Sequence, residues 1–188
     1  MSKRHLTNAL MRVAVVGTSC SGKTTLARDL SGIVGAAHIE LDALNWKANW
    51  EARPTAEFRS LVEEAISCER WITDGNYQAV RELVWSRATA VVWLNYPFWR
   101  VFSRALLRTF RRVLTGEELY SGNRESFRQA FFSRDSILLW VVTSHRRRNR
   151  EYRRLREMGP DDPRLTVLEF LDRAAEGRSR PPVALEFV

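Results

Sequence analysis

The sequence predicts an α/β fold in which helices cover both faces of a parallel sheet. Short apolar runs of strand length alternate along the chain with segments that carry apolar residues at helical spacing. No hairpin signal such as Asn-Gly separates two of the apolar runs, which favours parallel strands joined by helices. With 188 residues, no internal repeat and no linker, the chain is expected to form one domain over residues 1–188.

The first half of the chain alternates strand and helix signals. A Val-rich run over 12–16 predicts a buried strand, and residues 23–34 carry apolar residues at helical spacing. A second apolar run over 36–41 stops at Asp42 and predicts another strand. Thr55 is the expected N-cap of the helix that follows.

The second half repeats this alternation. Runs over 70–73 and 89–94 each predict a buried strand, with a short helix between them. A helix follows Pro97, and a longer one is expected from about residue 136 to 158. A last strand is expected over 165–171, and the tail over 172–188 shows no period.

Two stripes run along the helix after Pro97. Its apolar stripe consists of Trp99, Phe102, Leu106 and Phe110, and its cationic stripe of Arg100, Arg104, Arg108 and Arg111. Because residues three and four apart lie on one side of a helix, the two stripes are expected to face different ways.

The positive charge of the chain is concentrated in one segment. Lys and Arg number 30 against 22 Asp and Glu, which gives a net charge of +8, and 27 of the 30 basic residues are Arg. Residues 100–156 hold 15 Arg and 5 acidic residues, so they carry the whole excess. Such a segment favours an anionic partner, which is a set of nucleotide phosphates, a nucleic-acid backbone or anionic lipid.

Composition also excludes several classes of protein. No uncharged stretch approaches the ~20 residues that a membrane-spanning helix needs. Two cysteines cannot build a disulfide framework or a four-cysteine zinc site. The apolar run near the N-terminus is interrupted by Arg12 and is too short for an export signal, so we expect a cytoplasmic protein with no membrane partner.

Residues 17–24, Gly-Thr-Ser-Cys-Ser-Gly-Lys-Thr, match the phosphate-binding pattern G-x-x-x-x-G-K-[ST] between a predicted strand and a predicted helix. The glycines let backbone N–H groups curl around a phosphate, and Lys23 reaches the β- and γ-oxygens. The Thr24 hydroxyl suits Mg²⁺. We therefore expect ATP and Mg²⁺ as cofactors, with the nucleotide bound by Gly17, Thr18, Ser19, Cys20, Ser21, Gly22, Lys23, Thr24 and Thr25.

The absence of two motifs limits the classes of reaction that fit the sequence. No Lys is followed two residues later by Asp, as a guanine-reading N-K-x-D motif requires, which disfavours a GTP switch. No Asp-Glu pair ends a strand, as water-activating motors of this superfamily usually require. Transfer of the γ-phosphoryl to a bound acceptor is therefore favoured over simple hydrolysis.

Further motifs make the chain resemble the P-loop nucleotide kinases of the adenylate kinase group. Residues 71–75 stand where that family has an apolar strand ending in Asp-Gly, and Pro97 ends the next strand as a Pro does there. The Asp-Gly-Asn-Tyr and Leu-Asp-Ala-Leu-x-Trp signatures look like those of bacterial DNA topology modulation proteins, which are kinase-like. The resemblance implies a three-layer P-loop NTPase fold with a five-stranded parallel sheet in the order 2-3-1-4-5. It also implies an Arg-rich helical lid, which we place at 109–135.

The same resemblance assigns roles to single residues. It implies that Asp74 holds Mg²⁺ through water, and that Arg104 lies against the adenine. On the phosphates, it implies that Lys23 acts with Arg108, Arg134 and Arg146, the last from a run of three arginines. Planar guanidinium groups suit the equatorial oxygens of a transferring phosphoryl group.

The acceptor stays open at this point. The adenylate kinase group follows Asp-Gly with Phe-Pro-Arg, whereas this chain has Asn76-Tyr77-Gln78 and then Arg81. The run 40–42, Glu-Leu-Asp, looks like the acidic pair of the shikimate and gluconate kinase branch, where a carboxylate contacts a hydroxyl acceptor. A nucleoside monophosphate or a small hydroxyl compound is therefore expected among Asp42, Asn76 and Arg81. Asp42 is also a candidate Mg²⁺ ligand, and a DNA-interacting, ATP-binding regulator without turnover is the rival interpretation.

Overall fold

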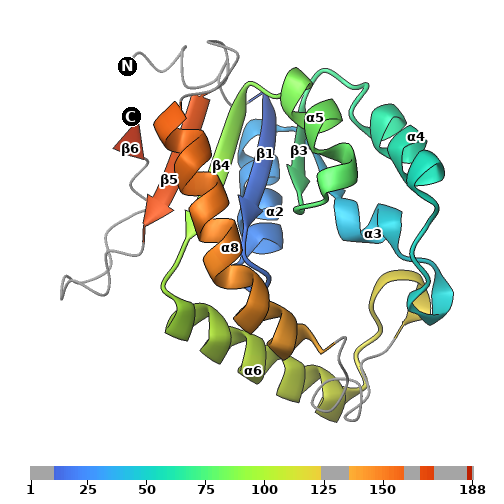
Figure 1. Ribbon diagram of the computed structural model, residues 1–188. Helices are drawn as coiled ribbons and strands as arrows, with labels where there is room; N and C mark the ends of the chain where they lie inside the picture. Colours follow the sequence, from blue (N-terminus) through green and yellow to red (C-terminus); the bar gives the residue numbers. More distant parts are fainter. Residues whose placement is uncertain (1–10, 124–135, 159–165, 172–185, 188) are drawn as a thin grey trace.

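The computed structural model describes residues 11–123, 136–158, 166–171 and 186–187, and it confirms an α/β fold with a parallel sheet and helices (Figure 1). The strands are β1 (Arg12–Gly17), β2 (Ala37–Glu40), β3 (Trp71–Asp74), β4 (Ala90–Asn95), β5 (Thr166–Leu171) and β6 (Glu186–Phe187). The helices are α2 (Lys23–Val34), α3 (Leu41–Asn45), α4 (Thr55–Ala65), α5 (Gln78–Arg87), α6 (Phe98–Thr115) and α8 (Ile137–Met158), with short 3-10 helices η1 (Ala48–Trp50) and η2 (Tyr120–Gly122).

The strands form one sheet in the order β2-β3-β1-β4-β5-β6. The pairs β2–β3, β3–β1, β1–β4 and β4–β5 are parallel, and β6 pairs antiparallel with β5. The expectation of a purely parallel, five-stranded sheet is therefore corrected, because the two-residue strand β6 adds an antiparallel edge. No period in the tail predicted this edge.

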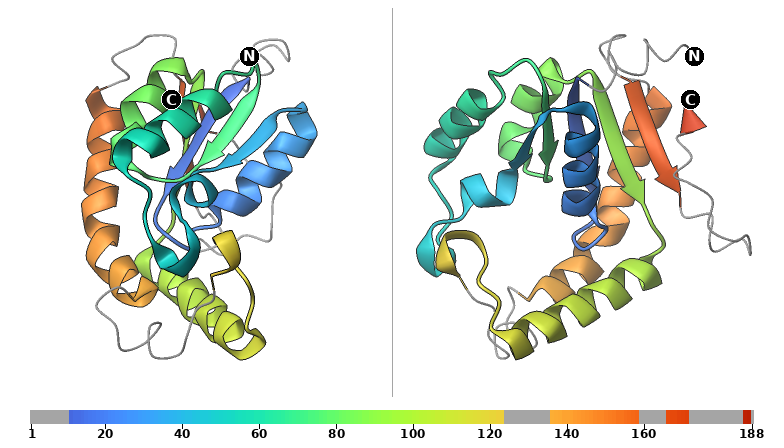
Figure 2. Two further views of the ribbon diagram at one scale, coloured as in Figure 1. Left: turned by 90° about the vertical axis from the view of Figure 1, so that its right-hand side faces the viewer. Right: turned by 180° about the vertical axis from the view of Figure 1, so that it is seen from behind.

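The buried strands divide their side chains between the two faces of the sheet. In β1, Val13 and Val15 pack towards α2, whereas Ala14 and Val16 pack into the cluster on the opposite face. Figure 2 shows α2 on one face and α4, α5 and α8 on the other. Because both faces are covered, the strands appear in the sequence as continuous apolar runs.

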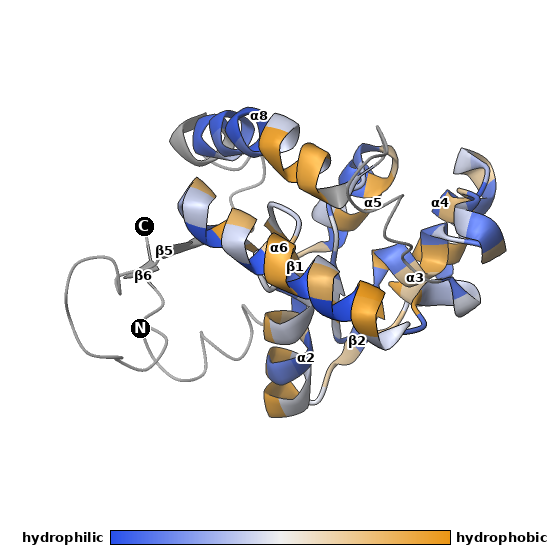
Figure 3. Cartoon of the chain, turned by 90° about the horizontal axis from the view of Figure 1, so that it is seen from below, coloured by the Kyte–Doolittle hydropathy of each residue, from blue (hydrophilic) through white to orange (hydrophobic). Residues whose placement is uncertain are grey.

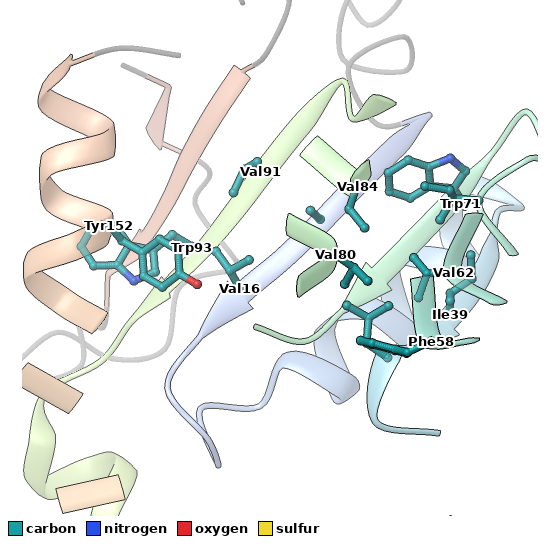
Figure 4. Packing of buried hydrophobic residues seen from close by; sticks show 13 residues of the cluster. Val16, Ile39, Phe58, Val62, Trp71, Val80, Val84, Val91, Trp93 and Tyr152 are labelled. Atoms are coloured by element: carbon teal, nitrogen blue, oxygen red, sulfur yellow. The ribbon is translucent and has the colours of Figure 1, made fainter. Parts of the chain in front are cut away.

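The larger cluster lies on the face covered by α4, α5 and α8. Tyr152 of α8 packs against Trp93 of β4, with ring centroids 5.8 Å apart (Figure 4). Phe58 of α4 and Val80 of α5 lie in the same cluster. This packing fixes α8 against the strands that end at the candidate site.

One local expectation needs correction, and one helix buries a different set of residues from its apolar stripe. Thr55 is the first residue of α4 and makes no capping hydrogen bond from its side chain, because Pro54 occupies the N-cap position. In α6, the apolar stripe is largely exposed: Trp99 is 62% and Phe110 is 51% exposed. The helix instead buries Val101, Ala105 and Thr109, a line of smaller residues at i, i+4 spacing that allows close packing on α8.

Helix α6 crosses the sheet at the carboxyl ends of the strands, beneath α8. Seen from below, blue and orange segments alternate along α6, while α8 has apolar first turns and is hydrophilic beyond them (Figure 3).

The predicted lid over 109–135 lies partly outside the described residues, as does the tail over 172–188. Both therefore stay predictions.

Candidate active site

The phosphate-binding pattern forms the turn between β1 and α2. Gly17, Cys20 and Gly22 have positive φ values of 148°, 65° and 93°. The Ser21 N–H donates to the Thr18 carbonyl at 3.1 Å, which closes the turn. Such a loop, followed by the N-terminus of a helix, turns backbone N–H groups towards a common point and suits an anion.

Lys23 begins α2 and lies over this turn. Its ammonium donates to the Thr18 carbonyl at 2.9 Å. Burial lowers the pKa of Lys23, while the carboxylates of Asp42 and Asp74 oppose the shift. A buried ammonium that is bound to a neutral carbonyl is poorly compensated, so it favours an anionic ligand beside it.

The Thr24 hydroxyl donates to Asp74 Oδ1 at 3.1 Å, and His38 Nε2 lies 2.7 Å from the other oxygen, Oδ2. These three side chains meet because α2 starts where β1 ends, while β2 and β3 pair in parallel register with Glu40 opposite Asp74. Burial raises the pKa of Asp74, and the His38 hydrogen bond and the Lys23 charge oppose the rise.

The oxygen donors of Thr24 and Asp74 fit Mg²⁺, which prefers one or two protein oxygens together with phosphate oxygens and water. Within the described ranges, no group of three or more His, Cys, Asp and Glu side chains is arranged to hold a metal ion. Asp42 has a different contact, because its Oδ1 accepts a hydrogen bond from the Tyr77 hydroxyl at 2.6 Å.

Asp74→Asn is expected to stabilise the protein in the absence of Mg²⁺ at neutral pH. Because the pKa of folded Asp74 is raised, the folded state holds this proton at pH values where the unfolded chain has lost it. Stability is therefore lost as the pH rises past the ordinary Asp pKa of 3.8, and asparagine avoids this loss. Thermal unfolding of both proteins between pH 4 and 7 checks this; a difference in Tm that stays constant with pH would contradict it.

The carboxyl ends of the strands open into a cavity with a volume of about 2190 Å³. This exceeds the roughly 300–1,000 Å³ typical of one small ligand, so it has room for a nucleotide and an acceptor. On one side lie Lys23, Thr24 and Asp74, and beyond them Asp42 and Tyr77. Arginines of α6 and α8 line another side: Arg104, Arg108, Arg112, Arg147, Arg148, Arg150 and Arg154.

The predicted arginines divide between the cavity and the outside. Arg108 lines the cavity, and Arg104 lies over the Tyr96 ring at 4.9 Å and donates to the Ser21 carbonyl at 3.4 Å. Arg146 is exposed and is not among the lining residues, whereas Arg148 is among them. The role predicted for Arg146 stays a prediction, and Arg147 and Arg148 of the same run are the ones that line the cavity. Arg134 lies outside the described residues.

The three predicted acceptor residues all line the cavity but differ in their contacts. Asp42 lines the cavity, where Tyr77 fixes one of its carboxylate oxygens. The amide of Asn76 instead binds the backbone of Gly17 and the Tyr152 hydroxyl. Arg81 pairs with Glu151 at 2.6 Å. Of the three, Asp42 is therefore the side chain best disposed to meet an acceptor.

The far end of the cavity is acidic and aromatic. Tyr120 donates to Glu40 Oε2 at 3.0 Å, and Trp46 and Trp50 make an edge-to-face pair at 5.8 Å. Burial and the nearby Asp42 and Glu40 carboxylates raise the pKa of Tyr120. Burial is the larger cause, and the two carboxylates add to it.

A strap over residues 120–123 joins η2 to η1 at this end. Asn123 is buried, accepts from the Trp50 N–H at 2.9 Å, and donates to the carbonyls of Lys47 and Tyr120, each at 2.8 Å. Ser121 adds one bond to the Trp46 carbonyl at 2.8 Å. The strap therefore holds Tyr120 over Glu40.

Asn123→Ala is expected to release the strap, because it removes three hydrogen bonds and leaves the Trp50 N–H without its acceptor. The local cost is about 1–3 kcal/mol. Hydrogen exchange of the Trp50 amide should become faster, while exchange in β1 stays unchanged. The control Ser121→Ala removes one exposed bond and should have a smaller effect; equal protection of Trp50 in Asn123→Ala and the unsubstituted protein would refute the prediction.

No protein-family model matches the sequence. No curated protein matches it either. Among solved structures, the chain is similar to a shikimate kinase from Bacteroides thetaiotaomicron, with 15% identity and a TM-score of 0.48 over 76% of this chain and 82% of that one. It is also similar to a gluconokinase from Sinorhizobium meliloti 1021, with 15% identity and a TM-score of 0.48 over 85% of this chain and 82% of that one.

A shikimate kinase from Aquifex aeolicus vf5 has 22% identity and a TM-score of 0.40 over 50% of this chain and 69% of that one. Likenesses at this level assign neither a family nor a substrate, so the function has to be inferred from the site itself. None of these three proteins is named as a DNA topology modulation protein, and that resemblance stays a prediction. None of the helices in the described ranges has the length and apolar character that a membrane crossing needs.

Sequence reasoning missed three residues of the site, namely His38, Tyr120 and Tyr152. His38 had a usable signal, since it lies two residues before Glu40 on a strand next to β3, so that both side chains share one face. Tyr120 and Tyr152 come from segments that meet the strands only through tertiary packing, and no local pattern marks them.

Proposed function

We propose that the protein is an ATP-dependent phosphotransferase that moves the γ-phosphoryl group of Mg-ATP to a small-molecule acceptor. The observation that carries this proposal is the buried Lys23 ammonium over the phosphate-binding loop, beside the Thr24–Asp74 pair. Together they supply a cation for phosphate oxygens and two oxygens for a metal ion. The kinase activity, the nucleotide and the metal are all part of this proposal.

Each group has a distinct role in the proposed reaction. Backbone N–H groups of the loop bind the β-phosphate, and Lys23 binds β- and γ-oxygens. Mg²⁺, when bound through Thr24 and Asp74, supplies positive charge that offsets the charge on these oxygens. Arg108 and Arg148 bind the equatorial oxygens of the transferring group, which a planar guanidinium suits.

We infer that the acceptor is a hydroxyl compound. Its oxygen attacks the γ-phosphorus, the bond from this phosphorus to the β,γ-bridging oxygen breaks, ADP leaves, and Asp42 takes the hydroxyl proton. Tyr77 holds one oxygen of Asp42 and thereby orients the other. Two of the arginines that line the cavity have acidic partners: Arg81 pairs with Glu151, and Arg28 lies 3.7 Å from Glu40. An acceptor phosphate, as in a nucleoside monophosphate, would find an acidic surface there.

A panel of acceptors tests this proposal. ADP release from Mg-ATP is measured with sugars, polyols, nucleosides and amino alcohols in one set, and with nucleoside monophosphates in the other. Release that depends on a compound of the first set supports the hydroxyl acceptor, and release that depends on the second set contradicts it. No acceptor-dependent release in either set, together with sequence-preferring DNA binding, would favour the regulatory alternative, which the comparisons do not support.

A further inference from the structure

The Asn76 side chain continues the pairing of β1 and β3 beyond the end of the strands. Backbone register ends with Val15 opposite Asp74, and the Gly75 N–H still reaches the Val15 carbonyl at 3.4 Å. One residue further along, opposite Gly17, the side-chain amide of Asn76 takes the place of a backbone peptide group. Its Oδ1 accepts from the Gly17 N–H at 3.2 Å, and its Nδ2 donates to the Gly17 carbonyl. Only a side chain with both a donor and an acceptor can make this pair.

The same Oδ1 also accepts a hydrogen bond from Tyr152 of α8 at 3.0 Å. The Tyr152 side chain is almost fully buried, and its ring packs against Trp93 at 5.8 Å and Trp85 at 6.5 Å. Figure 4 shows this ring held between α8 and β4. Because the ring is fixed by its neighbours, the hydroxyl has a defined position beside Asn76.

Arg148 lies one turn before Tyr152 on α8, on the same side of the helix. It lines the cavity, and its positive charge lowers the pKa of Lys23 and opposes the burial-driven rise in the pKa of Tyr152. Its buried Nε has no hydrogen-bond partner in the part of the chain that the structure describes. Arg148 therefore carries a buried donor into the same cavity as Lys23, from the side of α8 that also bears Tyr152.

We propose that Asn76 and Tyr152 are positioning residues that link the phosphate-binding loop to Arg148. The inference rests on the proposed ATP-dependent function. Contacts run from the Gly17 backbone through the Asn76 amide to the Tyr152 hydroxyl, and Arg148 lies one turn away on the same side of α8. Asn76 fixes the backbone at the start of the loop, and Tyr152 fixes the position of Arg148 relative to that loop. Arg148 is thereby held where it distinguishes ATP from ADP.

The test compares binding of ATP and ADP, each with Mg²⁺, to the full-length protein and its Tyr152→Phe, Arg148→Ala and double variants. Isothermal titration gives the Kd values, and no acceptor is needed. Tyr152→Phe removes one hydroxyl and keeps the ring packing. It should weaken ATP binding by about 3–10-fold, the worth of one hydrogen bond, and leave ADP binding within about twofold.

In the Arg148→Ala background, Tyr152→Phe should have no further effect on ATP binding, because the guanidinium that Tyr152 positions is already absent. Asn76→Asp should weaken both nucleotides, since it loses the donor to the Gly17 carbonyl and distorts the loop itself. Trp85→Phe is the packing control: it alters a ring neighbour of Tyr152 without touching Asn76, and it should leave the ATP-to-ADP ratio unchanged.

Two results would overturn the link while leaving the proposed function intact. One is a Tyr152→Phe effect on ATP that adds in full to that of Arg148→Ala. The other is an equal loss of ATP and ADP affinity in Tyr152→Phe, as a purely structural role predicts. If the unsubstituted protein binds neither nucleotide, both the proposed function and the link fail together.

Discussion

Lys23→Ala is expected to lower the rate of phosphoryl transfer by roughly 10²–10³-fold, the range found when one group that stabilises charge in a transition state is removed. The ammonium is buried over the loop and bound to a neutral carbonyl, so its removal takes away charge stabilisation, while Asp74 keeps its hydrogen bond with His38. Steady-state ADP release with the acceptor found by the panel measures the effect.

The fold should not suffer from this substitution. Removing a poorly compensated buried cation has no large cost in stability, so the Tm of Lys23→Ala should equal or exceed that of the unsubstituted protein. Lys47→Ala is the matched control, because Lys47 pairs with Glu57 at 3.2 Å outside the cavity. Full activity in Lys23→Ala would refute the proposed function.

Gly17→Ala is expected to lower the free energy of unfolding by about 2–4 kcal/mol, through backbone strain and overpacking. Gly17 has a φ of 148°, and an added Cβ would lie 2.8 Å from the Leu94 carbonyl oxygen and 3.0 Å from Ser21 Oγ. Neither a sheet carbonyl nor the loop can move away freely. Urea unfolding monitored by far-UV circular dichroism measures the loss.

Gly32→Ala is the control for this substitution. Gly32 lies within α2, and an added Cβ would meet nothing within 4 Å. There, alanine should raise stability by up to about 1 kcal/mol, because it favours the helix. Equal effects of the two substitutions would show that the close approach at Gly17 has no energetic consequence.

Local sequence patterns predict the phosphate-binding loop and its flanking strand and helix, because these segments adjoin in the chain. The Val-rich run, the glycine-bearing turn and the helix from Lys23 adjoin in the chain, and their residues determine the geometry without distant partners. The Asp-Gly pair was placed correctly at the end of a strand for the same reason. The sequence predicts its neighbour Asn76 as an acceptor residue, whereas in the structure Asn76 binds Gly17. No local pattern predicts this contact, because it depends on which strands lie side by side.

The arginine-rich helices show where sequence reasoning reaches its limit. Arg146, Arg147 and Arg148 are consecutive, and each step along a helix turns the side chain by about 100°, so the packing of α8 decides which of them line the cavity. In α6, the sequence separates an apolar stripe from a cationic one without predicting which residues pack on α8. The close approach of α8 favoured the smaller residues instead, and the aromatic side chains stayed outside.

The strand order has a consequence for how the chain folds. β1 pairs with residues far along the sequence, with Arg12 opposite Trp71 and Val13 opposite Ala90. A chain emerging from the ribosome therefore carries the complete phosphate-binding motif long before the neighbours of β1 exist. Because such distant contacts form slowly, the nucleotide site is expected to appear late in folding, and nucleotide binding during refolding would report the completed sheet.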